Sequence, residues 1–238
     1  MVELYRNAGL AIYEQAHYSQ GEDREEVAQL LSWYKRRHRR ILDIGCSGGL
    51  HALELARCGH RVVGVDREAS AVALARRRAR QEKLNAEFYV LDLECDSLLP
   101  LGRFDLIYSI GNVLSHLPKT SLAKVLRQIS GCTAPDGIIL FDLLILSPHV
   151  PDEVYEEASG ILWKRRCEGA SGRIELQGIF TRCEVTQNFQ VWGYTIAEVV
   201  QFLKISGFRT IDYAPTLDFP ARENDVARAV CLKFRAQL

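Results

Sequence analysis

The sequence predicts an α/β fold built on a doubly wound, mostly parallel sheet. Short apolar runs alternate with amphipathic helical stretches over residues 41–142, a pattern typical of repeated strand–helix–strand units. A glycine-rich turn follows the first apolar run, and aspartates end the next two. Ligands of such sheets bind beyond the carboxyl ends of the strands, so we expect these residues to gather at one site.

The stretch Ile41–Gly49 reads Ile-Leu-Asp-Ile-Gly-Cys-Ser-Gly-Gly, and it predicts a short buried strand that breaks into a glycine turn. A helix is expected at Leu50–Cys58, which places the turn at a helix N-terminus, where backbone amides bind ligands. The dinucleotide pattern Gly-x-Gly-x-x-Gly does not fit, because counting from Gly45 its second position is Ser47 and its third is Leu50. The spacing therefore argues against a nicotinamide dinucleotide.

The next two strands are expected at Arg61–Val65 and Ala86–Leu91, and each ends in an acid. Asp66 follows the second strand, where a carboxylate can accept hydrogen bonds from both hydroxyls of a ribose. Asp92, followed by Leu93, ends the third strand. The alternative for Asp66 is a surface acid without a ligand, but that alternative leaves the ordered series of strand, turn, helix, strand and acid unexplained.

The remaining elements are expected to complete the sheet around an inserted antiparallel region. Beyond Asp142 the pattern changes to period-two alternation, with a hairpin signal at residues 169–172. Thr195 and Glu198 form a capping box that begins a helix. The further expected strands are Phe104–Ser109, Gly137–Asp142 after a turn at 134–137, Ile161–Cys167, Gly172–Phe180, Cys183–Gln190, Phe208–Tyr213 and Val226–Phe234, and the further expected helices are Tyr5–Gly21, Glu22–Lys35, Ala69–Lys83, Lys119–Cys132 and Thr195–Gly207.

The glycine turn resembles the first motif of the class I S-adenosylmethionine-dependent methyltransferases, Asp-x-Gly-x-Gly-x-Gly. Asp43, Gly45 and Gly49 fit this motif, and Ser47 stands in the place of its middle glycine. The resemblance covers nearly the whole chain from residue 41 onward. It implies a Rossmann-like methyltransferase sheet of seven strands, of which the last runs antiparallel.

The resemblance also implies S-adenosylmethionine as the cofactor, and it implies which residues bind it. In this family an acid and the residue after it meet the adenine, and Asp92 and Leu93 match that position. The acid that binds the ribose matches Asp66. The implied cofactor-binding residues are Tyr13, Asp43, Gly45, Cys46, Ser47, Gly49, Asp66, Arg67, Asp92, Leu93 and Ser109. No metal site is expected.

A shorter resemblance concerns the loop after the fourth strand. The segments 110–112 (Ile-Gly-Asn) and 115–118 (Ser-His-Leu-Pro) look like the glycine and sarcosine N-methyltransferase branch and its small-molecule relatives, which implies methylation of nitrogen. The expected catalytic residues are His116, Asn112 and Tyr18. Because the ordinary pKa of histidine lies near neutrality, His116 is suited to remove a proton from an amine acceptor. The alternative is a loop or helix-capping histidine.

The N-terminal helix is rich in tyrosine, and Tyr13 and Tyr18 are candidates to cap the cofactor pocket, as such segments do in small-molecule methyltransferases. Alternatively, these tyrosines only dock the helix on the domain. The inserted antiparallel region is expected to lie over the strand ends as a lid, with Trp163, Trp192 and Tyr194 facing the pocket or the core. Four regions are expected: a helical cap at 1–40, a cofactor-binding core at 41–142, the lid at 143–194, and the last helix and two strands at 195–238.

Composition and charge exclude several classes of protein. Lysine plus arginine equals aspartate plus glutamate at 30 each, so no overall field draws the chain to nucleic acid or to an anionic membrane. The seven cysteines are scattered without a Cys-x-x-Cys pair, which is typical of the reducing cytosol. No apolar run reaches the roughly 18 residues of a membrane span, and no signal-peptide pattern begins the chain. A soluble cytoplasmic protein is expected.

Two alternative functions stay open. Basic runs at 35–40 and 76–80 allow an RNA methyltransferase, although cations also suit a helix C-terminus. An Asn-Pro-Pro-Tyr type motif for amino methylation of adenine or cytosine is missing. The second alternative is a catalytically idle cofactor-binding subunit. The expected partner is a small-molecule methyl acceptor, with no membrane and with nucleic acid disfavoured. The acceptor's identity, the methylated atom (nitrogen, oxygen or carbon) and a homodimer stay open.

Overall fold

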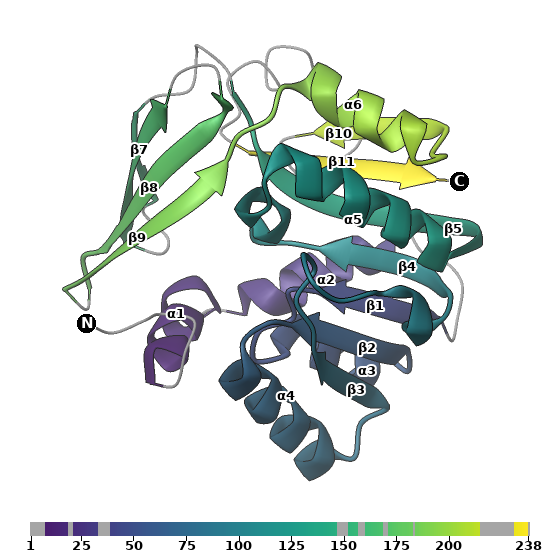
Figure 1. Ribbon diagram of the computed structural model, residues 1–238. Coiled ribbons are helices and arrows are strands. Elements are labelled where there is room, and N and C mark those ends of the chain that lie inside the picture. Colours follow the sequence, from purple (N-terminus) through teal and green to yellow (C-terminus); the bar gives the residue numbers. More distant parts are fainter. Residues whose placement is uncertain are drawn as a thin grey trace.

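The computed structural model describes residues 8–18, 21–32, 39–146, 152–156, 160–168, 171–182, 184–214 and 231–237. Within them, seven strands form a central sheet in the order β10-β11-β5-β4-β1-β2-β3 (Figure 1). β11 runs antiparallel to both of its neighbours, whereas the pairs among β1 to β5 are parallel. The expected sheet is therefore confirmed. Its strands are β1 (Arg40–Ile44), β2 (Arg61–Asp66), β3 (Ala86–Val90), β4 (Phe104–Ser109), β5 (Thr133–Leu144), β10 (Thr210–Ala214) and β11 (Cys231–Gln237).

Helices cover both faces of the central sheet and make a three-layer arrangement (Figure 1). Three helices pack on one face and two on the other. The first set is α2 (Glu22–Ser32), α3 (Leu50–Arg57) and α4 (Ala69–Glu82), the second set is α5 (Lys119–Cys132) and α6 (Ile196–Ile205), and the short 3-10 helices are η1 (Leu99–Leu101) and η2 (Val113–His116).

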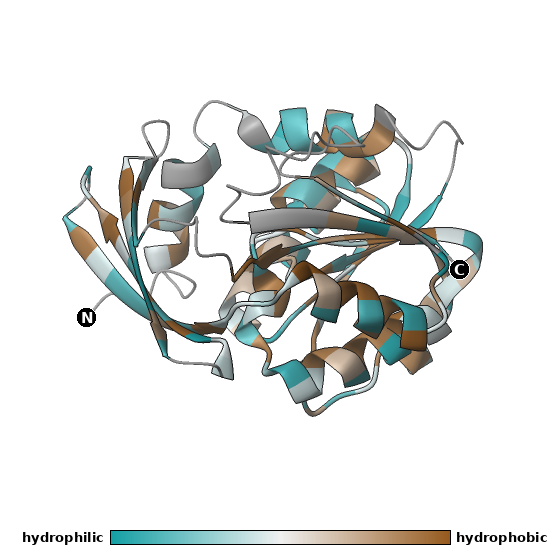
Figure 2. Cartoon of the chain, turned by 90° about the horizontal axis from the view of Figure 1, so that it is seen from above, coloured by the Kyte–Doolittle hydropathy of each residue, from teal (hydrophilic) through white to brown (hydrophobic). Residues whose placement is uncertain are grey.

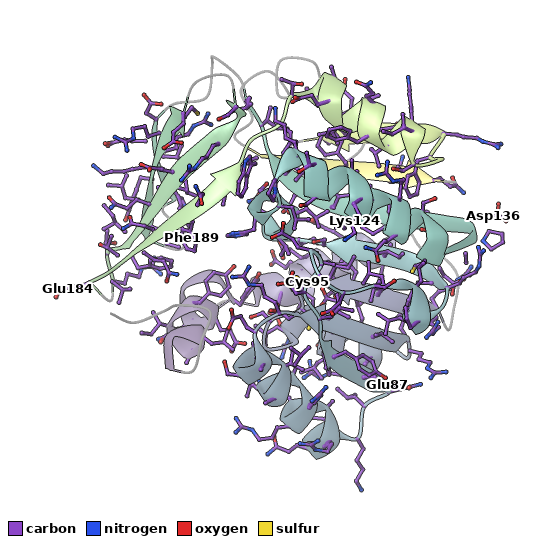
Figure 3. All side chains as sticks on the ribbon, viewed as in Figure 1. Glu87, Cys95, Lys124, Asp136, Glu184 and Phe189 are labelled. Atoms are coloured by element: carbon purple, nitrogen blue, oxygen red, sulfur yellow. The ribbon has the colours of Figure 1, made fainter. Side chains whose placement is uncertain are left out.

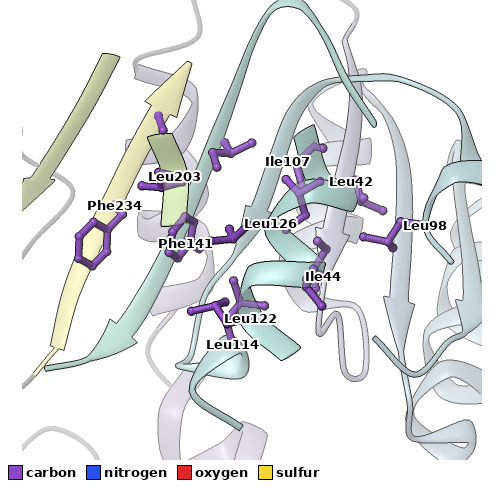
Figure 4. Close-up of a cluster of buried hydrophobic side chains, with 14 of the residues drawn as sticks. Leu42, Ile44, Leu98, Ile107, Leu114, Leu122, Leu126, Phe141, Leu203 and Phe234 are labelled. Carbon is purple, nitrogen blue, oxygen red and sulfur yellow. The ribbon is translucent and has the colours of Figure 1, made fainter. Parts of the chain in front are cut away.

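Successive residues of a central strand serve opposite faces of the sheet, because side chains alternate along a strand. In β1, Leu42 and Ile44 join a cluster with Leu122 and Leu126 of α5 (Figure 4), whereas Ile41 packs on the other side with the residues of α2 and α3. Each of these five side chains is at most 1% exposed. Burial of one such side chain contributes about 1.5–3 kcal/mol, so this double pattern holds the strand between the two helical layers.

A second, antiparallel sheet stands beside the central one (Figure 2). The N-terminal helix α1 (Ala8–Tyr18) packs against it, since Ile12 and Tyr13 contact the buried pair Ile161 and Phe180. The fold therefore has the separate antiparallel sheet that the period-two pattern predicts. Its strands, in order across the sheet, are β6 (Glu153–Glu156), β7 (Ile161–Glu168), β8 (Arg173–Phe180) and β9 (Val185–Trp192).

The start of β5 differs from the sequence prediction. The strand begins at Thr133, which pairs with Phe104 of β4, and the next pair joins Leu106 to Ile138. The predicted turn at 134–137 is therefore a bulge inside the strand, because pairing with β4 resumes on both sides of it. The residues at 134–137 bend the strand, as turn residues do, but the strand continues beyond them.

The other predicted elements are present, and where the structure describes their ends these differ from the predictions by up to three residues. The capping box at Thr195 is confirmed, because Thr195 Oγ1 accepts from the Glu198 amide at 3.2 Å and Glu198 Oε2 accepts from the Thr195 amide at 2.8 Å. The short strand β6 was not predicted. Residues 5–7, 19–20, 33–35, 183 and 226–230 of predicted elements, with 169–170 of the predicted hairpin, lie outside the described ranges.

No helix in the described part of the chain is long and apolar enough to cross a membrane.

Candidate functional site

A cavity of about 210 Å³ lies at the carboxyl ends of β1, β2, β3 and β4. This is the edge at which open α/β sheets bind ligands, and α1 closes one side of it. Of the residues predicted as a site, Gly49, Ser109 and Asn112 do not line the cavity in the described structure. The predicted residues that do line it are Tyr13, Tyr18, Asp43, Gly45, Cys46, Ser47, Asp66, Arg67, Asp92, Leu93 and His116.

The glycine turn takes its shape from three residues in the left-handed region of backbone conformation. Gly45, Ser47 and Gly49 have φ of 80°, 47° and 84°. A Cβ on Gly45 would stand 2.4 Å from Cγ2 of Val113, so only glycine fits there. Ser47 adopts the conformation that the family motif gives to glycine, at a cost of roughly 1–2 kcal/mol. Gly49 begins α3 as its N-cap residue and contributes shape without a surface on the cavity.

Asp66 at the end of β2 holds the glycine turn. Its Oδ2 accepts a hydrogen bond from the Ser47 amide, and its Oδ1 accepts one from the Glu68 amide, both at 2.9 Å. Burial raises the pKa of Asp66, and these two amide bonds oppose that shift. A carboxylate has about four acceptor positions, so Asp66 keeps acceptor capacity toward the cavity that it lines.

The end of β1 places a second acid deeper in the site. Asp43 is 4% exposed, and burial raises its pKa to about 6 against the opposing charge of His51. Burial also raises the pKa of the neighbouring Cys46 thiol, with the charges of Asp43 and Asp66 adding to the effect. Cys46 therefore lines the cavity as a neutral thiol.

His51 and Glu26 form a pair beside the cavity that was not predicted from the sequence. His51 Nε2 lies 2.7 Å from Glu26 Oε2, and the His51 ring meets that of Tyr18 edge-on with centroids 5.3 Å apart. Burial raises the pKa of Tyr18, and Glu26 raises it further, so the phenol stays neutral. The position of His51 in the first turn of the helix after the glycine turn was the signal available in the sequence.

Asp92 follows β3 and is half-buried beside the cavity with Leu93. Asp92 Oδ1 accepts a hydrogen bond from the Glu94 amide at 2.9 Å, and the Asp96 carboxylate accepts one from the Asp92 amide at 2.8 Å. The two acids thus brace this loop, and the backbone amide of Leu93 follows directly after Asp92.

The loop after β4 is organised by Asp142, a residue that the sequence analysis placed only at the end of a strand. Asp142 is 3% exposed, and its carboxylate accepts hydrogen bonds from the amides of Gly111 at 3.0 Å and Asn112 at 2.6 Å. Ser109 is also turned away from the cavity, because its Oγ donates to the carbonyl of Ile44 at 3.0 Å. Asn112 and Ser109 therefore support the wall of the cavity without lining it.

His116 ends η2 and lines the same cavity as Asp43, Asp66 and Asp92. No hydrogen bond joins its ring to another described residue, and the ring of Phe189 lies 6.1 Å away. Burial, with a smaller contribution from Arg67, lowers the pKa of His116 to about 4. The expectation of a pKa near neutrality is therefore wrong: at neutral pH this imidazole is uncharged and is a weaker base than an exposed histidine.

The aromatic residues of the insertion lie beside the cavity and do not line it. Tyr194 is fully buried and donates a hydrogen bond to the Leu117 carbonyl at 2.6 Å, and Trp192 packs on the same core. Trp163 contacts the ring of Phe189, with centroids 6.1 Å apart. Figure 3 shows Phe189 on β9 and Glu184 at the far tip of that hairpin.

Several described arginines of the two basic runs have partners within the fold. Arg39 pairs with Asp105 at 2.9 Å, and Arg40 donates to the carbonyls of residues 101 and 103. In α4, Arg76 donates to the carbonyl of residue 88, and Arg78 binds Glu14 of α1. These contacts give four arginines of the two runs partners inside the protein.

Comparison with known proteins identifies the core of the chain. Residues 41–137 match a family model described as a methyltransferase domain. A ubiquinone biosynthesis O-methyltransferase of Nitrosococcus oceani is 32% identical over 128 residues, which are 52% of this chain and 53% of that protein. The protein of the same name from Coxiella burnetii is 33% identical over 109 residues, 44% of each chain. The chain thus spans about half the length of these curated relatives.

Solved structures share the fold along nearly the whole chain. An S-adenosylmethionine-dependent methyltransferase from Clostridium acetobutylicum has a TM-score of 0.73 at 14% identity, covering 96% of this chain and 97% of that one. CalS10, an amino pentose methyltransferase from Micromonospora echinaspora solved with S-adenosylmethionine, has a TM-score of 0.68 at 18% identity, covering 100% of both. Residues 41–137 thus match a methyltransferase domain, and the chain has the fold of solved S-adenosylmethionine-dependent methyltransferases. The glycine and sarcosine branch stays a prediction.

The residues of the cavity offer groups that suit S-adenosylmethionine, the cofactor that the sequence predicts. The absence of a side chain at Gly45, where a Cβ would reach Val113, leaves the backbone bare beside the cavity. Asp66 can accept from ribose hydroxyls and Asp92 from an exocyclic amine, and both line the cavity on neighbouring strand ends. Two carboxylate acceptors for the hydroxyl and amine donors of a nucleoside thus follow one another in the order in which the strands lie.

A pair of substitutions tests the geometry of the glycine turn. Gly45→Ala should lower the free energy of unfolding by at least about 2 kcal/mol, because the methyl group meets Val113 and the backbone conformation is unfavourable. Ser47→Gly should change it by less than about 1 kcal/mol, since relief of strain is offset by the larger entropy of the unfolded chain. Urea unfolding measures both, and a Gly45→Ala variant as stable as the wild type would contradict this geometry.

Proposed function

We propose that this protein transfers the methyl group of S-adenosylmethionine to a nitrogen atom of a small-molecule acceptor. The observation that carries the proposal is the placement of His116 in the same cavity as Asp43, Asp66 and Asp92. The acids supply the contacts for a nucleoside cofactor, and His116 supplies, at the next strand end, a polar group without a hydrogen-bonding partner among the described residues. A cofactor site and an acceptor contact thus share one cavity.

When bound, S-adenosylmethionine supplies a methyl group that is already activated on its sulfonium. The protein then has to hold the acceptor lone pair in line with that methyl group and to exclude water. His116 would accept a hydrogen bond from the acceptor, while Tyr13 and Tyr18 of α1 cover the cavity from the side opposite the strands. In this proposal, 1–40 caps the cofactor, 41–142 with 195–238 forms the core, and 143–194 selects the acceptor.

The pKa of His116 favours nitrogen over oxygen as the methylated atom. A neutral amine offers a lone pair directly and releases its proton only after the methyl group has moved. A hydroxyl oxygen becomes a good nucleophile when a base removes its proton, and a histidine with a pKa of about 4 does this poorly at neutral pH. An orienting role for His116 therefore suits an amine better than an alcohol.

Oxygen is the second candidate, because the curated relatives from Nitrosococcus oceani and Coxiella burnetii carry the name ubiquinone biosynthesis O-methyltransferase. Those relatives match about half of the chain. CalS10 and the glycopeptide N-methyltransferase MtfA share the fold along 100% and 90% of this chain at 18% and 13% identity. Their names supply test acceptors, and a panel of amino sugars, amino acids, aliphatic amines and phenols covers both atoms.

Methyl transfer from labelled S-adenosylmethionine to this panel, with identification of the methylated atom, tests the proposal. Asp66→Asn should weaken cofactor binding by roughly 1.5–3 kcal/mol, the range for a hydrogen bond to a charged group. Asp136→Asn is the matched control, because Asp136 is exposed and lies at the end of the molecule away from the antiparallel sheet (Figure 3). Calorimetry measures both. Equal affinities in the two variants would overturn the ribose contact, and binding without any turnover would indicate an idle subunit.

The role of His116 is tested by turnover against pH. For an amine acceptor, the acid limb should follow the pKa of the acceptor and move when a less basic amine is used. His116→Asn should leave that limb in place while turnover falls by about a hundredfold and cofactor affinity stays normal. The opposite result would be an acid limb near pH 4 that is the same for every acceptor and is absent in His116→Asn. It would mean that His116 is the base for an oxygen acceptor.

The fraction of folded protein must be measured at each pH at which turnover is measured. The pKa of His116 is about 4 in the folded protein against an ordinary 6.5, so the unfolded chain binds more protons between these values. Stability from the uncharged imidazole is therefore present above pH 6.5 and is lost as pH falls toward 4.

The acceptor-selecting role of the antiparallel sheet is tested at Trp163, which reaches His116 through Phe189. Trp163→Ala should raise the KM for the acceptor by about tenfold, the effect of losing a well-packed aromatic contact, and leave the Kd of S-adenosylmethionine unchanged. Trp163→Phe should restore most of the loss. Tyr155→Ala is the control on the same sheet, because Tyr155 is 55% exposed. An unchanged acceptor KM in the Trp163→Ala variant would refute this role.

A further inference from the structure

The order of the strand ends gives the cofactor a direction across the cavity. This inference rests on the proposed cofactor binding. β3, β2, β1 and β4 lie side by side in that order. Adenine beside Asp92 and ribose beside Asp66 leave the end of β1, with Asp43, to the amino-acid part of the cofactor. That part carries an α-ammonium group and an α-carboxylate, and the carboxylate needs a cationic partner.

The cavity is rich in acids and poor in cations beside β1. Asp43 and Glu14 line it there. Arg67 lies on the ribose side, next to Asp66 in the chain, and its side chain is 65% exposed. Arg78 is bound to Glu14 at 2.8 Å and does not line the cavity. Among the described residues that line this end, His51 is the cationic candidate.

His51 is held in position for such a role. Its Nε2 binds Glu26 of α2 at 2.7 Å, and its Nδ1 has no hydrogen bond to another described residue. Burial by itself lowers the pKa of His51, but Glu26, with smaller effects of Asp43 on β1 and Asp23 on α2, outweighs burial and raises the pKa above 6.5. The ring of Tyr18 closes the side that faces α1. A buried imidazole whose charged form is favoured by Glu26 thus stands at the end of the cavity that is left for the carboxylate.

We propose that His51, positioned by Glu26, binds the α-carboxylate of the cofactor's amino-acid part. A cationic N–H donor forms a strong, charge-assisted hydrogen bond with a carboxylate. The first-turn amides of α3, which lack helical partners, add positive potential at the same place. His116 cannot take this role, because it follows β4 and its pKa is about 4. The site therefore selects nucleosides that carry a free α-carboxylate.

Calorimetry with two ligands tests this selection. S-adenosylmethionine and decarboxylated S-adenosylmethionine share the nucleoside, the sulfonium and the ammonium group, and differ only in the carboxylate. At pH 6.5, below the pKa of His51 in the folded protein, the wild type should bind the carboxylate-bearing ligand about 10- to 150-fold more tightly, the range for a charged hydrogen bond.

His51→Gln keeps a polar contact to Glu26 and removes the charge. It should bring the affinity ratio of the two ligands close to one, with decarboxylated S-adenosylmethionine bound within about threefold of the wild type. Glu26→Gln does not touch the cavity and should reduce the ratio in the same direction but less, because His51 then loses part of its protonation. If His51 had only a structural role, its substitution would lower the affinities for both ligands equally, and their ratio would stay at the wild-type value.

The outcomes separate this inference from the proposed function. A wild type that binds S-adenosylmethionine but shows no preference over the decarboxylated ligand overturns the role of His51 alone. So does a preference that persists in both variants. A wild type that binds neither ligand overturns the proposed function together with this inference. A preference that collapses in His51→Gln and weakens in Glu26→Gln supports it.

Discussion

The two hydrogen bonds from backbone amides to the Asp66 carboxylate hold the site together. They join the glycine turn after β1, through Ser47, to the start of α4, through Glu68. Ser47 lies in a left-handed conformation, and a charge-assisted hydrogen bond of this kind offsets much of its strain. Without this carboxylate the turn would lose its link to the neighbouring strand, and the shape of the cavity floor would change.

Much of the fold could be predicted because its signals are local. The strand at Ile41, the glycine turn and the capping box at Thr195 depend on residues within a few positions of one another. The early start of β5 at Thr133 could not be predicted in this way, because it depends on pairing with β4 across the sheet. Likewise β6, with only four residues, is a strand through its partner β7.

The site residues that strand order brings together could be predicted from the sequence. The contacts that depend on the packing of distant side chains could not. Strand order brings Asp43, Asp66 and Asp92 to one edge, so their shared cavity follows from the pattern of the sequence. The partners of His51 and Asp142 lie 25 and about 30 residues away, and no spacing rule connects them. The pKa of His116 depends on how deeply the loop is buried, which sequence does not reveal.

The two sheets are mechanically connected at Tyr194. Tyr194 lies where the antiparallel sheet joins the core, fully buried, with its amide donating to the Leu144 carbonyl and its hydroxyl to the Leu117 carbonyl. Leu117 directly follows His116. Because Tyr194 ties the end of the antiparallel sheet to residue 117, any shift of that sheet would also displace the residue next to His116.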